Sequence, residues 1–95
     1  MNSTSGNNRQ ESLNAIAMDK LLQNAAKASI EIDQRGLSGD DAMAFFIDSQ
    51  FKVIQQLMNE NAATIDEAVD AFISSGAAGE SANRQWIKDL ILGNI

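Results

Sequence analysis

Apolar residues recur along this chain at intervals of three and four, which is the spacing of one face of an α-helix. In the first such stretch the face consists of Leu13, Ala17, Leu21, Ala25, Ala28 and Ile32. Glu31 and Arg35 are spaced to form an i,i+4 ion pair, and Gly36 follows where a left-handed helix end favours glycine. The pattern predicts a long helix over residues 11–35.

A second long helix is predicted over residues 39–59. Its apolar stripe consists of Met43, Ile47, Ile54, Leu57 and Met58, flanked by Phe46, Phe51 and Val53. Ser38 is a candidate N-cap, and Asp40 and Asp41 place negative charge at the positive end of the helix dipole. Because the connection between the two long helices is short, we expect them to pack antiparallel as a hairpin.

Two short helices are predicted next, over residues 65–75 and 81–92. Thr64 and Glu67 have the spacing of a capping box at the start of the first of them. The residues expected to face inward are Ile65, Ala68, Val69, Phe72 and Ile73, followed by Trp86, Ile87, Leu90 and Ile91. No stretch alternates as a strand does. The sequence therefore predicts an all-α, four-helix domain over residues 11–95, preceded by a flexible polar tail, residues 1–10.

Composition narrows the possible chemistry. Among 95 residues there is no histidine and no cysteine, so the usual nucleophile–base pairs and transition-metal ligands are missing. The adjacent acids Asp40–Asp41 and Asp66–Glu67 begin helices, where carboxylates act as caps. We therefore expect no catalytic residue, no metal and no cofactor. The longest apolar run, Ala42 to Ile47, is far shorter than the roughly 20 residues of a membrane span, so we expect a cytoplasmic protein.

Three large apolar residues fall outside the predicted stripes. On a helical wheel, Ile16 and Ile30 lie nearly opposite Leu21, with Gln23 midway between them at heptad spacing, and Phe45 lies away from the stripe of the second helix. Either the short helices cover these positions, or Ile16, Gln23, Ile30 and Phe45 form a surface for self-association or for another protein.

The leading prediction is a non-enzymatic protein-interaction module, such as a small adaptor, chaperone-like protein or inhibitor, that binds another protein and forms a homodimer. A structural subunit of a larger assembly is a further class. The alternative is a DNA-binding regulator in which residues 64–92 form a helix-turn-helix. Its candidate contacts are Ser81, Asn83, Arg84, Gln85 and Lys88. The net charge of −6, with 13 acids and 7 bases, argues against nucleic acid as a partner.

Overall fold

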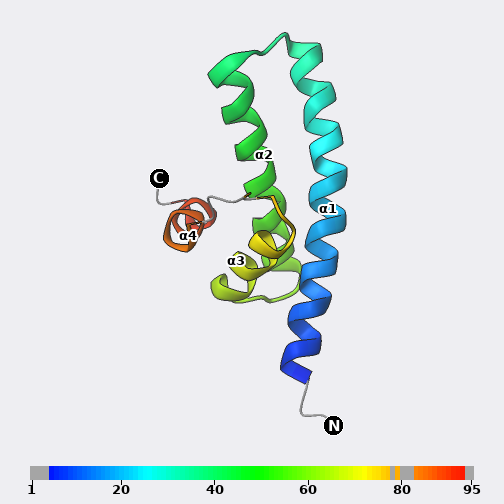
Figure 1. The fold of residues 1–95 in the computed structure, drawn as a ribbon, viewed down its shortest axis with the longest axis vertical. Coiled ribbons are helices and arrows are strands. Elements are labelled where there is room, and N and C mark those ends of the chain that lie inside the picture. Colours follow the sequence, from blue (N-terminus) through cyan, green and yellow to red (C-terminus); the bar gives the residue numbers. More distant parts are fainter. Residues whose placement is uncertain (1–4, 78, 80–82, 94–95) are drawn as a thin grey trace.

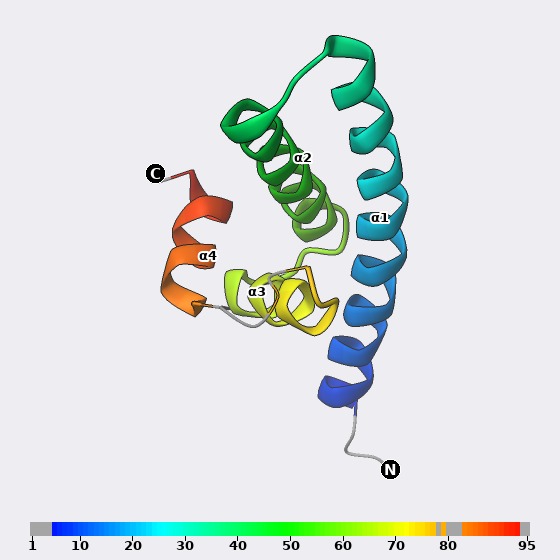
Figure 2. The same cartoon turned by 45° about the horizontal axis from the view of Figure 1, so that its top comes forward.

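The computed structural model describes residues 5–77, 79 and 83–93. They form four α-helices: α1 (Ser5–Arg35), α2 (Gly39–Glu60), α3 (Ile65–Ser74) and α4 (Arg84–Leu92). The long helices α1 and α2 run antiparallel as a hairpin, and α3 and α4 lie beside its lower half (Figures 1 and 2). The prediction of a small all-α domain with two long and two short helices is confirmed.

Helix α1 begins earlier than the apolar pattern indicates, so residues 5–10, assigned to a polar tail, are part of it. The Arg9 side chain reaches the start of α3, where its Nε donates to Oε2 of Glu67 at 2.8 Å. Its Nη2 donates to the carbonyl oxygens of Asn61 at 2.9 Å and Ala62 at 3.1 Å. Hydrophobic periodicity missed this extension because the residues that hold it are polar and distant in sequence.

The capping box at the start of α3 is confirmed. The Thr64 hydroxyl accepts from the Glu67 N–H at 3.1 Å, and the Glu67 carboxylate accepts from the Thr64 N–H at 2.9 Å. The hydrogen bond from Arg9 lowers the pKa of Glu67 most, followed by the bond from the Thr64 backbone. The ionised carboxylate therefore stabilises the fold above the ordinary carboxyl pKa, and this contribution is lost as the pH falls through the lowered pKa.

All four helices contribute to one hydrophobic core. Its buried apolar side chains are Leu13, Ala17, Leu21, Phe51, Ile54, Leu57, Ala68, Val69, Ala71, Phe72, Ile87 and Ile91. The Phe51 and Phe72 rings are stacked with their centres 4.9 Å apart, and Trp86 meets Phe51 edge-on at 6.3 Å. These three rings join α2, α3 and α4, so they fix the position of the short helices on the hairpin.

Two residues expected in the core are largely exposed. Met43 is 64% exposed although it lies on the same stripe as the buried Ile54. The reason is that α3 and α4 do not extend to the end of α2 that carries Met43 (Figure 1). Trp86 is 48% exposed although its ring packs against Phe51 in a T-shaped arrangement. The apolar pattern therefore gives the correct face of each helix without showing which part of it is covered.

Thr64→Ala is expected to lower the free energy of unfolding by about 1 kcal/mol, because the first turn of α3 loses its side-chain cap. Thr64→Ser retains the hydroxyl and is the matched control. Urea unfolding followed by far-UV circular dichroism measures both. Equal transition midpoints for the alanine and serine variants would show that the cap contributes nothing.

Candidate functional site

The structure places the four predicted interaction residues in different environments. Ile16 is half-buried and packs against the core, whereas Ile30 is 58% exposed. Gln23 is exposed and donates to Asp19 at 2.9 Å. Phe45 is half-buried, with the Arg35 guanidinium 5.1 Å from its ring centre. Of the three apolar residues, Ile30 is exposed and the other two are half-buried.

The predicted DNA-contact residues that the structure describes are largely engaged within the protein. Asn83 caps α4 by accepting from the Trp86 N–H at 2.9 Å, and Arg84 forms an ion pair with Asp70 of α3. Gln85 donates to Asp89 at 2.9 Å. Lys88 is half-buried, and Ser81 lies outside the described residues. The Arg84–Asp70 pair joins the two short helices, and the other two contacts lie within α4 or at its start, which gives a structural reason for these polar residues.

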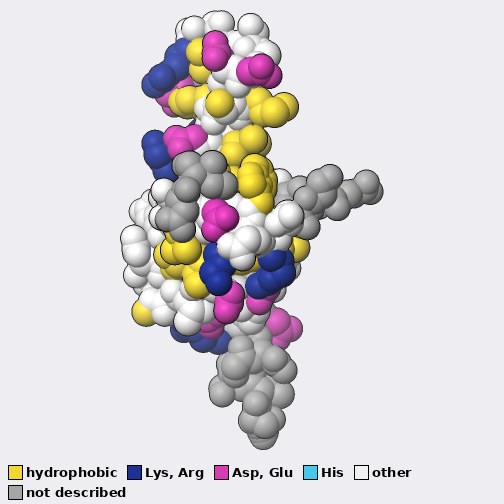
Figure 3. Space-filling view, turned by 90° about the vertical axis from the view of Figure 1, so that its left-hand side faces the viewer, with side chains coloured by type: hydrophobic (Ala, Val, Ile, Leu, Met, Phe, Trp, Pro, Cys, Tyr) yellow, Lys and Arg dark blue, Asp and Glu magenta, His cyan; other side chains and the backbone are white. Residues whose placement is uncertain are grey.

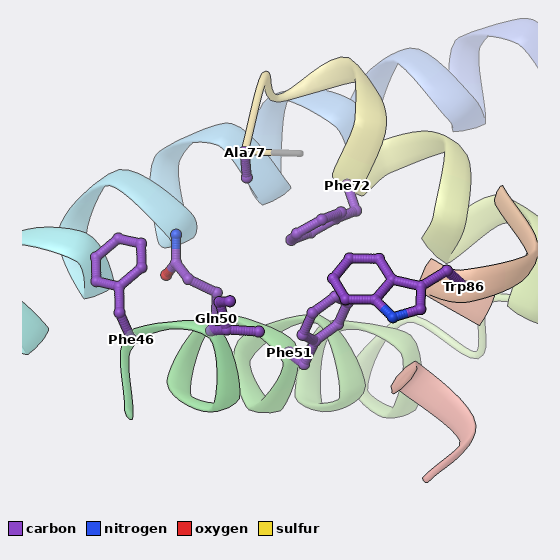
Figure 4. A pocket seen from close by; sticks show the side chains of 7 residues that line it. Phe46, Gln50, Phe51, Phe72, Ala77 and Trp86 are labelled. Atoms are coloured by element: carbon purple, nitrogen blue, oxygen red, sulfur yellow. The ribbon is translucent and has the colours of Figure 1, made fainter. Parts of the chain in front are cut away.

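An apolar groove that sequence reasoning missed runs along one side of the hairpin. One part, of about 140 Å³, is lined by Phe46, Ile47, Gln50, Phe51, Phe72, Ala77 and Trp86 (Figure 4). The adjoining part, of about 290 Å³, is lined by Met18, Leu21, Leu22, Ala25, Phe46, Gln50, Ser75, Gly76 and Ala77. The two parts share Phe46, Gln50 and Ala77, and we call them together the hairpin groove. None of its described lining residues is charged.

The hairpin groove exists because the core stripe of α2 extends beyond the short helices. Met43, Ile47, Gln50 and Ile54 follow one another at helical spacing, and their exposure falls from 64% at Met43 to 0% at Ile54. On α1, Leu22 is 66% exposed at the other edge. Figure 3 shows hydrophobic side chains along the upper part of the hairpin. In the upper part of the hairpin, the described residues form α1 and α2 alone. In the lower part, α3 and α4 pack beside these two helices.

One buried polar side chain lies at the floor of the groove. Gln50 is 6% exposed, and its Oε1 accepts from Asn24 Nδ2 at 2.6 Å. Asn24 also donates to the Ser49 hydroxyl at 3.1 Å. Within the described part of the chain, Nε2 of Gln50 has no hydrogen-bond acceptor, and the amide projects from α2 between Phe46 and Ala77 (Figure 4). This nitrogen can therefore donate to a molecule that enters the groove.

The other side of the hairpin is polar. A hollow there is lined by Lys20, Gln23, Asn24, Lys27, Val53 and Gln56. The two sides of the α1–α2 pair thus differ in chemistry, with lysines on one and uncharged, mainly apolar side chains on the other. The groove side is the one on which a protein partner would gain from apolar burial.

Within the ranges that the structure describes, no group of acidic residues is arranged to hold a metal ion. In the same ranges, no helix combines the length and the apolar character that crossing a bilayer requires.

No family model matches this chain. No curated protein and no solved structure matches it either.

The Asn24–Gln50 hydrogen bond gives a prediction about the groove floor. Asn24→Leu alone is expected to lower the free energy of unfolding by about 1–3 kcal/mol, because the buried Gln50 carbonyl loses its donor. Adding Gln50→Leu removes the unpaired amide, so the second change should be stabilising in the Asn24→Leu protein. Urea unfolding of the two single variants and the double variant measures the coupling. If Gln50→Leu has the same effect with and without Asn24, the two side chains are not energetically linked.

Proposed function

We propose that this protein is a non-enzymatic binding module that receives an apolar segment of another protein in the hairpin groove. The observation that carries the proposal is the exposure of large apolar side chains at the groove and beside it. Leu22, which lines the groove, is 66% exposed, and Met43, one turn before Phe46 on α2, is 64% exposed. Met18 and Trp86, also about half exposed, extend the same surface at 46% and 48%. Large apolar side chains that gather along a groove are typical of protein-interaction sites.

The free energy gained by burying the exposed apolar side chains determines how much of the groove a partner must cover. Completing the burial of Leu22 and Met43 contributes roughly 2–4 kcal/mol, since each is already partly buried. Association costs at least about 4 kcal/mol in lost translational and rotational freedom. Those two side chains are therefore insufficient by themselves. A partner that stays bound must also cover Met18, Phe46 and Trp86, which means that it must fill the groove along its length.

The chemistry of the chain supports binding over catalysis. It has neither histidine nor cysteine, and the groove has no charged residue among its described lining. Gln50 is the polar group at its floor, and an amide orients a ligand without supplying a nucleophile or a base. An adaptor, a chaperone-like protein or an inhibitor each uses such a site.

The double variant Leu22→Gln/Met43→Gln is expected to lose the bound partner. Both residues are exposed, so glutamine removes apolar surface without opening the core or changing the net charge. Ile30→Gln, at a residue 58% exposed outside the groove lining, is the matched control. Immobilised wild-type protein and both variants are compared in affinity capture from the native cell lysate. A protein held by wild type and by Ile30→Gln, and lost from the double variant, supports the proposal.

The same capture pattern for all three proteins would contradict a role for the groove. Sedimentation velocity on the same set tests self-association. A wild-type dimer that the double variant converts to monomer would identify a second copy of this chain as the occupant.

A further inference from the structure

Resting on the proposed function, we infer that the occupant of the hairpin groove is a basic amphipathic α-helix of another protein. It lies along α1 and α2 and completes a three-helix bundle in the upper part of the hairpin. The turn after α3, with Ser75, Gly76 and Ala77, lines the groove, so the occupant continues the layer that the short helices begin.

The length of α2 that the short helices leave uncovered fits a short helix. The part of α2 from its start to Gln50 has 12 residues, 39–50, within the 22 of the helix. At about 1.5 Å per residue this segment is roughly 18 Å long. An occupant helix of about 12 residues, or three turns, therefore matches it and presents apolar side chains at i, i+3, i+4 and i+7.

The polarity of the lining favours a helix over an extended segment. A strand placed in the groove would bring unpaired backbone N–H and C=O groups against apolar side chains, which costs free energy for each group left without a partner. Among the described lining side chains, the Gln50 amide offers the main polar contact. A helix satisfies its own backbone internally, so it can fill the groove without these penalties.

Charge around the groove identifies the occupant as basic. Asp33 follows Leu22 by three turns, so it lies on the same side of α1. Asp40 precedes Met43 by one turn of α2. Neither carboxylate belongs to an ion pair formed within the described chain. They give the end of the groove nearest the hairpin tip an acidic rim, and Figure 3 shows acidic side chains at that tip.

The positive charges of this region are neutralised or placed elsewhere. Arg35 is paired with Glu31 at 2.5 Å, and Lys52 is paired with Asp48 at 3.0 Å. Lys20 and Lys27 line the hollow on the other side of the hairpin. A second copy of this chain would bring a further net charge of −6 to the rim. Electrostatics therefore favours a cationic helix over self-association.

Gln50 adds a preference within the occupant. Its Nε2 can donate to a side-chain oxygen, so a single glutamine or asparagine facing the groove floor would satisfy it. One buried polar pair in an otherwise apolar seam sets the register of two helices. The occupant is thus a helix whose apolar stripe contains one central amide side chain and is flanked by lysine or arginine.

Two synthetic helical peptides test this inference against the full chain. Both carry the same leucine stripe with a central glutamine and contain no tryptophan, and their outer positions are lysine in one and glutamate in the other. Trp86, the one tryptophan of the sequence, reports occupancy through its fluorescence. Anisotropy of labelled peptides gives the dissociation constants independently. The lysine peptide is expected to bind about 10-fold or more tightly than the glutamate peptide at low salt, with a smaller ratio at high salt.

Variants separate the contributions of charge and apolar contact. Asp33→Asn/Asp40→Asn should reduce the preference for the lysine peptide. Leu22→Gln/Met43→Gln should weaken binding of the lysine peptide by about 10-fold or more, and Ile30→Gln should leave it unchanged. Equal affinity for the two peptides would overturn the basic occupant and leave the groove as a binding site. If neither peptide binds, or if the double variant Leu22→Gln/Met43→Gln binds the lysine peptide as tightly as wild type, the groove is not the binding site.

Discussion

The stack of Phe51 on Phe72, with Trp86 against its edge, determines the organisation of this molecule. It fixes α3 and α4 on the lower half of a hairpin that is longer than they can cover. Below this junction, the apolar faces of α1 and α2 are closed by the short helices. Above it, the same faces continue into the hairpin groove. The site therefore follows from a mismatch in length between the long helices and the layer packed on them.

Polar contacts reinforce the lower half and leave the upper half to the α1–α2 pair. Arg9 joins the start of α1 to Glu67, and Arg84 joins α4 to Asp70. In the upper half the described ion pairs connect residues within one helix, as in Glu31–Arg35 and Asp48–Lys52. Exposed pairs of this kind contribute little to stability, so packing against a partner would add more there than in the lower half.

Helical spacing in the sequence was sufficient to predict the fold class, the hairpin and the capping box, because these depend on residues close in sequence. It could not predict the groove. Met43 and Ile54 occupy one stripe, and Ile16 and Ile30 occupy one position on the helical wheel, yet one member of each pair is covered and the other is exposed. Coverage depends on where α3 and α4 end, which is decided by contacts between distant residues such as Phe51 and Phe72.

Amide hydrogen exchange of the free protein tests most directly whether the upper hairpin lacks a covering layer. The amides of Ile54 and Leu57 are expected to exchange only through global unfolding. Those of Phe46 and Ile47, about two to three turns nearer the tip of the same helix, are expected to exchange through local opening, with a free energy lower by about 1–2 kcal/mol or more. Equal opening free energies at all four positions would contradict the account, because they would mean that both halves of the hairpin are supported alike.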